Sequence, residues 1–274
     1  MDRGPCRERT FPFRLAPFFE RRYGSYLRWM VHLLERLGPT CTRALWQAAC
    51  ADYDETLLME ILTRGWNSVA EEEATDREAI TANLLAEWFP WPIETVSADE
   101  ARRLVEETPP LLQIGQSFPS LDVQRESTAY EALHLIFDGE ALLAESLIDR
   151  HGKEGELIVY DLIRDGRIAA GQGKTGTVAQ FMADWLATPT EPDIFTAGLE
   201  IEVIQASDRE SVTHVRECEW ARYFRDHHPR VGYLIACSTD EVAIKSFNEH
   251  LRMQRSSTLM EGGEVCDFRI YAVQ

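Results

Sequence analysis

Residues 265–272 read VCDFRIYA, and the valine, isoleucine and aromatic residues of this stretch are typical of a β-strand. Residues 199–203 (LEIEV) and 231–236 (VGYLIA) are similarly rich in strand-forming residues. Helical patterns dominate the chain before residue 199. The sequence therefore predicts an α+β fold, with a helical N-terminal half and helices packed on a small sheet in the C-terminal part.

Apolar residues recur at helical spacing through most of the first 187 residues. The pair Pro109-Pro110 ends the first series of helices, so we expect a helical N-terminal region over residues 1–110 and an α+β domain over residues 111–274. The expected helices run over residues 17–37, 40–53, 55–63, 127–150, 153–169 and 177–187, with further helices opening at the capping boxes Thr75-x-x-Glu78 and Ser97-x-x-Glu100.

The chain is acidic, with 28 Lys and Arg against 46 Asp and Glu and a formal net charge of -18. Most of its surface should repel a phosphate backbone, so we expect no nucleic-acid partner. Arginine and phenylalanine residues gather within residues 3–22. We interpret this segment as a basic lead-in to the first helix, with an arm that binds a membrane surface or a partner as the alternative.

The 274 residues include no run of about eighteen apolar residues, and the start lacks the apolar core of a secretion signal. The six cysteines include no C-x-x-C pair, which argues against a disulfide scaffold or a zinc ribbon. We therefore expect a cytoplasmic protein with reduced thiols and no membrane association.

Three motifs are weak. The segment Gly171–Thr175 lacks the first glycine of a phosphate-binding loop and is better explained as a connection between helices. Glu131-x-x-His134 has the spacing of a di-iron ligand pair, but no second pair exists, so a solvated helix face is the simpler interpretation. We expect His227 and His228 to be surface residues of a loop before a proline.

Cys237 has the most specific local context. If residues 231–236 form a strand and Ser238-x-x-Glu241 caps the next helix, this cysteine lies at a strand-to-helix turn. The amides and the dipole of a helix N-terminus favour anions and lower the pKa of a thiol. The alternative is a cysteine of the hydrophobic core, with Asp240 complementing the helix N-terminus.

A metal site is a further alternative, although we do not favour one. His214 and Cys218 lie four residues apart and could share a helix face, and two further cysteines come from the segments that we expect to form the sheet. Such His and Cys ligands suit a divalent metal such as zinc. The ligands of this alternative are His214, Cys218, Cys237 and Cys266.

One order of motifs resembles a known family. Cys218 is followed by aromatic residues, then by residues 232–240 (GYLIACSTD) and by residues 255–268 (RSSTLMEGGEVCDF). This order resembles the L-2-amino-thiazoline-4-carboxylic acid hydrolase family, most clearly over residues 215–270 and more weakly back to Tyr130–His134. The ending also resembles, more distantly, the 4-vinyl reductase-like small-molecule-binding domains. That second resemblance implies a twisted antiparallel sheet against helices, with cysteine-bound zinc in some relatives.

The hydrolase resemblance implies opening of a cyclic amidine ring in a small substrate derived from an amino acid, with a carbamoyl-cysteine as product. A carbon–nitrogen or carbon–sulfur bond is broken, and no cofactor is favoured. We expect Cys237 to act as the nucleophile and His214 to exchange protons. Asp240 or Asp267 would hold the cationic amidine.

The same resemblance implies a substrate-binding set. We expect Arg255 to pair with the substrate carboxylate, and Thr258 with the backbone of Gly262 and Gly263 to complete the pocket. In a metal-dependent version a metal-bound hydroxide replaces the thiol, and the cysteines become ligands. Transfer to an acceptor other than water stays open.

The rival from another class is a module that binds or senses a small molecule without turnover. The expected partner in either case is a small molecule, with a homo-oligomer possible. A role in specialised biosynthesis fits a scaffold whose substrate is changed by a few residues.

Overall fold

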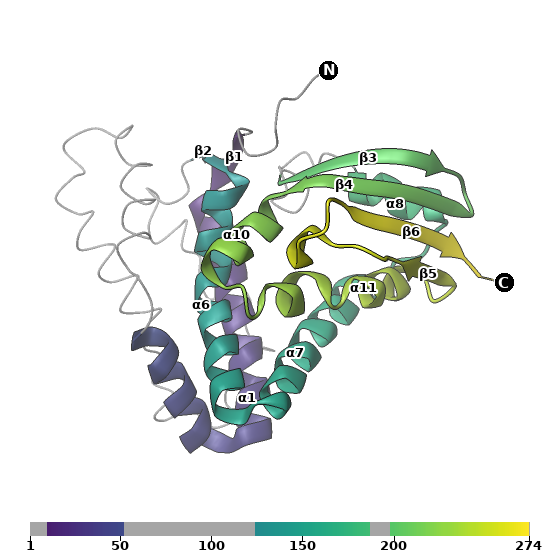
Figure 1. Ribbon diagram of the computed structural model, residues 1–274. Coiled ribbons are helices and arrows are strands. Elements are labelled where there is room, and N and C mark those ends of the chain that lie inside the picture. The colour runs from purple at the N-terminus through teal and green to yellow at the C-terminus, as the bar shows by residue number, and fades with distance from the viewer. Residues whose placement is uncertain (1–9, 52–123, 187–197, 274) are drawn as a thin grey trace. The chain divides into compact units, whose positions relative to one another are not determined.

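The computed structural model describes residues 10–51, 124–186 and 198–273 (Figure 1). The helices expected at residues 55–63 and after Thr75 and Ser97, and the boundary expected at residue 110, lie outside these residues. The described residues belong to two compact units. One unit contains residues 13–51 and the middle of α6 (Ala129–His151), and the other contains the two ends of α6 and residues 147–273.

Helix α1 (Leu15–Ala51) dominates the first of these units and changes direction at Gly38. Gly38 has a φ of 74°, which glycine adopts without strain, and Pro39 then starts a new helical turn. The helices predicted at residues 17–37 and 40–53 are therefore confirmed as the two halves of α1. Trp29, Met30, Leu33 and Leu34 are buried in the first half of this helix.

The other unit is built on a four-stranded antiparallel sheet, which confirms the α+β class. Its strands are β3 (Leu199–Ala206), β4 (Glu210–Cys218), β5 (Leu251–Gln254) and β6 (Cys266–Ala272), in the order β3-β4-β6-β5. A separate two-stranded sheet pairs β1 (Thr10–Arg14) with β2 (Gln124–Thr128). The strands predicted at residues 199–203 and 265–272 are confirmed.

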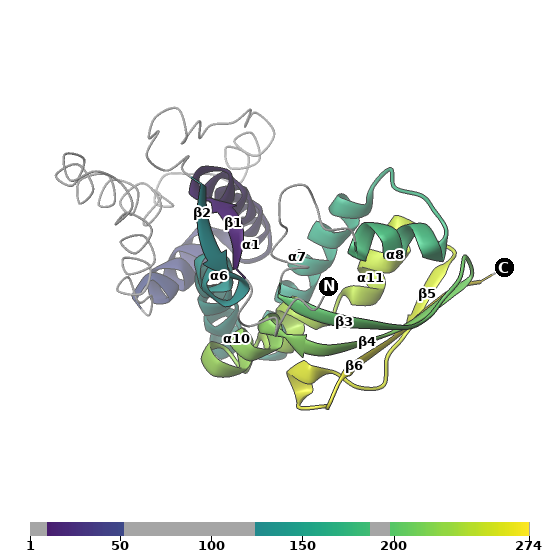
Figure 2. The same cartoon turned by 90° about the horizontal axis from the view of Figure 1, so that it is seen from above.

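Helices α8 (Val178–Leu186) and α11 (Asp240–Phe247) lie over one face of the four-stranded sheet (Figures 1 and 2). Helix α7 (Lys153–Gly171) packs against α11. A cluster of buried side chains fills the space between α8, α11 and the sheet; its members are Val178, Met182, Ile244, Phe247, Leu251 and Ile270. The helices predicted at residues 127–150, 153–169 and 177–187 are thus confirmed as α6, α7 and α8.

Strand β4 has polar residues on its buried face, so sequence patterning did not reveal it. Ser211, Thr213 and Val215 are each at most 2% exposed, while the residues between them are only half-buried. This alternation follows the two-residue period of a strand. The opposite face of the sheet carries ion pairs, such as the one between Arg269 and Glu210 at 2.5 Å.

The strand predicted at residues 231–236 is wrong. Those residues lead into a π-helical turn, η4 (Tyr233–Cys237), that precedes α11. A short apolar run is equally compatible with a buried helical segment, and here packing selects the helix. Gly232 permits this because a Cβ atom there would lie 2.6 Å from Phe224 Cβ and 2.9 Å from Met260 Sδ.

The cap predicted at Ser238 is also wrong. Thr239 is the N-cap residue of α11 and makes no side-chain capping bond, while Ser238 Oγ donates to the carbonyl of Leu234 at 2.6 Å. A capping box does form at the start of α6, where Glu131 and Thr128 exchange side-chain and backbone hydrogen bonds.

Helix α10 (Glu219–His227) ends beside the start of α6, and this changes two expectations about histidines. His134 is 5% exposed and lies edge-on to Tyr223 and His227, so the solvated-face interpretation is wrong for this residue. His227 is exposed as expected, but it is the last residue of α10 and not part of a loop, and His228 is buried. The connection expected at Gly171–Thr175 is confirmed between α7 and α8. Within the described residues, no helix has the length and apolarity needed to cross a membrane.

Candidate functional site

Three cysteines from separate elements belong to one electrostatically coupled cluster. Cys218 ends β4 and is the N-cap residue of α10, Cys237 ends η4, and Cys266 begins β6. The charge of Asp240 acts on all three thiols, and that of Arg255 acts on Cys237 and Cys266. Topology therefore brings together three cysteines that are far apart in sequence.

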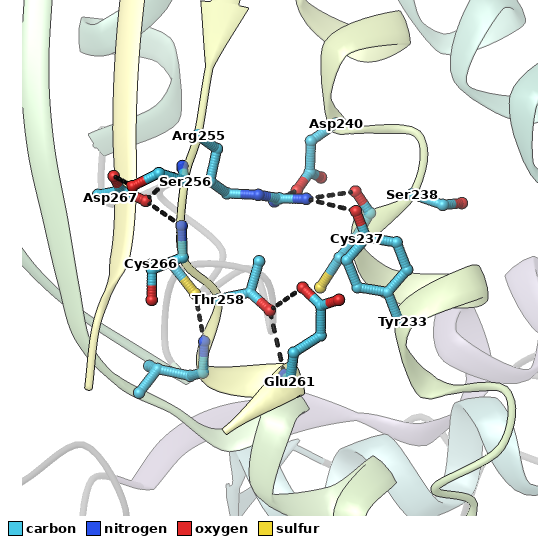
Figure 3. Close-up of polar contacts among 12 residues, drawn as sticks. Tyr233, Cys237, Ser238, Asp240, Arg255, Ser256, Thr258, Glu261, Cys266 and Asp267 are labelled. Atoms are coloured by element: carbon cyan, nitrogen blue, oxygen red, sulfur yellow. Dashed lines mark hydrogen bonds and ion pairs between the residues drawn. The ribbon is translucent and has the colours of Figure 1, made fainter. Parts of the chain in front are cut away.

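The central ion pair of the cluster joins Arg255 to Asp240. Arg255 Nη1 donates to Asp240 Oδ2 at 2.5 Å, and Nη2 donates to the carbonyl of Cys237 at 3.1 Å (Figure 3). The Arg255 side chain is 7% exposed and that of Asp240 is 24% exposed. The guanidinium also lies 5.3 Å from the ring centroid of Phe268, a cation–π distance. Arg255 thus links α11, η4 and β6.

Asp240 faces the sheet because of its position on α11. Residues 240, 244 and 247 lie on one stripe of a helix, and the latter two, Ile244 and Phe247, are buried against the sheet. Burial raises the pKa of the Asp240 carboxyl, although Arg255 and Arg167 oppose the rise. The two arginines therefore stabilise the charged form of this carboxyl, but by less than burial destabilises it.

The thiols have raised pKa values, contrary to the lowering expected at a helix N-terminus. Burial raises the pKa of Cys237, and the negative charge of Asp240 adds to the effect. Burial likewise raises the pKa of Cys218 to about 12 and raises that of Cys266. Desolvation and a neighbouring carboxylate outweigh the helix dipole, so the three cysteines are neutral thiols in the resting protein.

Asp267 organises the loop that carries Arg255. Its carboxylate accepts hydrogen bonds from the amides of Ser256 and Ser257, at 2.9 and 2.6 Å, and from Ser256 Oγ at 2.5 Å (Figure 3). Burial works against its ionisation, but these donors outweigh burial and lower the pKa of Asp267. Of the two aspartates predicted to hold an amidine, Asp240 acts on all three thiols, whereas Asp267 acts on Cys266 alone.

Thr258, Gly262 and Gly263 form a tight turn around η5 (Leu259–Glu261). Thr258 Oγ1 accepts from the Glu261 amide and donates to Glu261 Oε2 at 2.9 Å, while the amides of Gly262 and Gly263 donate to the carbonyls of Leu259 and Thr258. Gly262 has a φ of 88°. This turn also positions Cys266, whose Sγ accepts from the Leu259 amide at 3.1 Å.

The structure does not bring His214 to the thiol of Cys266. His214 pairs with Asp267 across β4 and β6, and Cys266 pairs with Val215 in the next register position. Adjacent residues of a strand face opposite sides, so His214 lies on the face away from the Cys266 side chain. Among the described residues, no group of three or more His, Cys, Asp or Glu side chains is arranged to hold a metal ion.

Several residues of the site were not predicted to have a role. Tyr233 OH accepts from Arg255 Nη2 at 3.4 Å, and Phe268 stacks on the same guanidinium. Ser256 and Glu261 fix the turns on either side of Thr258. All four lie within or beside the quoted motifs, but their contacts depend on the pairing of β4, β5 and β6, which the sequence pattern did not reveal.

Comparison with known protein families gives a match over this part of the chain. Residues 130–270 match the family described as L-2-amino-thiazoline-4-carboxylic acid hydrolase. The chain belongs to this family. The match to the hydrolase family runs from the start of α6 into β6 and includes all four strands of the main sheet and the whole thiol cluster. No curated protein and no solved structure gives a significant match.

Membership of the L-2-amino-thiazoline-4-carboxylic acid hydrolase family confirms the resemblance stated on residues 218–268. The weaker resemblance at Tyr130–His134 also falls within the matched range. The family is named for a hydrolase, and the matched segment contains Cys218, Cys237, Cys266 and the Asp240–Arg255 ion pair.

Proposed function

We propose that the chain is a hydrolase that opens a thiazoline-type or related cyclic amidine ring, with Cys237 as the nucleophile. Membership of the hydrolase family supports the reaction class. The observation that carries the choice of Cys237 is that Arg255 donates both to the Asp240 carboxylate and to the Cys237 carbonyl, and that Asp240 raises the pKa of Cys237 more than any other charge does. A buried carboxylate beside a thiol suits a cationic substrate that reacts with sulfur.

The raised pKa of Cys237 fits a nucleophile that is activated only when the substrate binds. A protonated amidine brings a positive charge next to Asp240 and Cys237. That charge offsets the negative charge of Asp240, which is one cause of the raised thiol pKa. Binding therefore lowers the pKa of Cys237, and the substrate itself promotes formation of the thiolate.

The proposed reaction has two stages, ring opening by Cys237 and hydrolysis of the resulting adduct. The Cys237 thiol loses its proton as its sulfur adds to the ring carbon between nitrogen and sulfur, and one ring bond then breaks as the departing nitrogen or sulfur takes up that proton. The carbon is then an amidine-like adduct on Cys237. Water adds to this carbon, the bond to the Cys237 sulfur breaks, and the thiol is restored. The net change is the addition of one water to give a carbamoyl product.

Arg255 has a positioning role in this proposal, in place of the expected pairing with the substrate carboxylate. Its two terminal nitrogens already donate to Asp240 and to the Cys237 carbonyl. By fixing both groups, Arg255 keeps the carboxylate and the thiol in one orientation. It also restrains the turn that precedes α11.

A mass-spectrometric turnover assay with 2-aminothiazoline-4-carboxylate tests the proposal. The unmodified protein is expected to give a product heavier by one water. Cys237→Ser is expected to lose at least about 100-fold in turnover, because a serine hydroxyl is a poor substitute for a thiolate. Cys41→Ser, a substitution in α1, is the matched control and should keep its turnover.

The outcomes separate the parts of the proposal. Similar turnover by Cys237→Ser would remove covalent catalysis and leave the hydrolase. Ligand-induced thermal stabilisation without product would favour the small-molecule-binding alternative. Neither turnover nor stabilisation would reject this substrate class.

We propose further that hydrolysis needs no metal, since His214 lies on the face of the sheet opposite Cys266. Turnover should be unchanged after exhaustive treatment with a chelator and removal of the chelator by dialysis. A loss of activity that added Zn²⁺ restores would contradict this expectation.

A further inference from the structure

Thr213 has a buried side-chain hydroxyl for which the described residues provide no hydrogen-bond partner. It lies in β4, is 1% exposed, and its Oγ1 forms no hydrogen bond with any residue that the structure describes. A buried hydroxyl without a partner costs stability, and such groups are rare in folded proteins. A functional partner supplied by a ligand would explain why threonine occupies this position.

The side chain of Thr213 faces the same side of the sheet as the thiol cluster. Thr213 pairs with Phe268 across β4 and β6, and Cys266 pairs with Val215 two residues along the strand. Residues paired in this way share a face, and residues two apart also share a face. The Thr213 hydroxyl therefore faces the layer that contains Cys266 and the Phe268 ring, over which Arg255 lies.

Ser211 provides the contrast within the same strand. It shares the buried face with Thr213 and is also 1% exposed, but its Oγ donates to the carbonyl of Gln205 at 3.2 Å. Ser211 pairs with Ile270, a member of the apolar cluster. Among the described residues, the hydroxyl that pairs with Ile270 thus has a hydrogen-bond partner, and the one that pairs with Phe268 has none.

We infer that the Thr213 hydroxyl binds substrate by hydrogen bonding to the amidine group of the ring. This inference rests on the proposed function and adds a binding residue that lies outside the family motifs. A hydroxyl both donates and accepts, so it is suited to an amidine nitrogen in either protonation state. An analogue in which carbon replaces that nitrogen would leave the hydroxyl unsatisfied and would bind more weakly.

The test compares Thr213→Val with Ser211→Ala in the full chain. Valine keeps the β-branched shape of threonine and removes the unsatisfied hydroxyl, so the Tm should stay the same or rise. The same variant should lose roughly tenfold in kcat/KM for 2-aminothiazoline-4-carboxylate, because the substrate loses a buried hydrogen bond. Ser211→Ala should show the reverse pattern, with a lower Tm and unchanged kcat/KM.

Thr213→Ser is the rescue variant, since it restores the hydroxyl and should recover most of the kcat/KM that valine loses. Thermal stabilisation by 2-aminothiazoline-4-carboxylate is measured alongside and should be weaker for Thr213→Val than for the unmodified protein. Turnover by the unmodified protein together with an unchanged kcat/KM for Thr213→Val would overturn the inference and leave the proposed function. Neither turnover nor stabilisation of the unmodified protein would overturn both.

Discussion

At the scale of single residues, the carboxylate of Asp240 helps to raise the pKa of the three neighbouring thiols. It adds to the effect of burial on the Cys237 thiol, and it holds Arg255 in a largely buried ion pair. A buried carboxylate is costly unless it is paired, so the same residue influences both reactivity and stability.

Replacement of Asp240 should make Cys237 more acidic. In Asp240→Asn one of the two main causes of the raised pKa is removed while the thiol stays buried. The pH at which Cys237 is half alkylated by iodoacetamide, followed by peptide mass spectrometry, should move downward. Glu241→Gln is the control, because Glu241 pairs with Lys245 at 2.7 Å and is not among the groups that shift Cys237. An unchanged alkylation profile in Asp240→Asn would contradict the proposed coupling.

The Asp240–Arg255 pair should be more costly to break than to replace. Arg255→Met leaves Asp240 as a buried charge without this partner and should lower the free energy of unfolding by about 3 kcal/mol. The double variant Asp240→Asn, Arg255→Met removes both charges and should recover part of the loss. Urea denaturation of the four proteins measures the coupling, and strictly additive effects would argue against a buried pair.

At the scale of elements, the π-helical turn η4 depends on the close approach of Gly232 to Phe224 and Met260. Gly232→Ala should destabilise the protein by about 1–3 kcal/mol, because the new Cβ atom overlaps Phe224. Gly166→Ala, inside α7, is the control: nothing lies within 4 Å of its added Cβ, and the helix should gain about 0.5–1 kcal/mol. Denaturation midpoints measure both. A Gly232→Ala protein as stable as the parent would mean that the turn can shift without cost.

The sequence predicted those elements whose apolar residues recur with the period of a helix or are concentrated in a strand-forming run. Helices α6, α7 and α8 have apolar stripes, and β6 is rich in strand-forming residues. Strand β4 was missed because its buried face includes Ser211 and Thr213, and residues 231–236 were misread because a short apolar run has no helical or strand signature of its own. The choice of Cys237, Asp240 and Arg255 came from motifs, but the pairing between them depends on contacts across separate elements.

Residue types alone did not determine the electrostatics of the site. The expected lowering of the Cys237 pKa relied on a helix N-terminus. In the structure, burial of the thiol and the charge of Asp240 raise this pKa instead. His214 was grouped with the cysteines because of its spacing from Cys218. Because side chains alternate between the two faces of β4, His214 instead lies on the face opposite Cys266. Burial and strand parity are properties of the folded chain, so spacing did not reveal them.

At the scale of the whole molecule, the raised pKa values predict loss of stability in alkali. Cys218, Cys237 and Cys266 have raised pKa values in the folded state, so each contributes stability that is present below the unfolded thiol pKa of about 8.5 and is lost as the pH rises toward the folded value. Each thiol should then cost about 1.4 kcal/mol per pH unit. Urea midpoints between pH 7 and pH 10.5 should fall, and Cys218→Ser should reduce the slope. A flat profile would be inconsistent with buried neutral thiols.

The antiparallel pairing of β4 with β6 has a consequence for the order of events during folding. Cys237, Asp240 and Arg255 all lie in the stretch of chain between these two strands, so pairing of the strands closes a loop that contains them. Closing a long loop costs chain entropy before the contacts inside it can form and stabilise the structure. Such non-local pairing is slow relative to helix formation. We therefore expect the cluster of Cys218, Cys237 and Cys266 to be among the last parts of this unit to assemble, so that an incompletely folded chain exposes these three thiols more than the folded chain does.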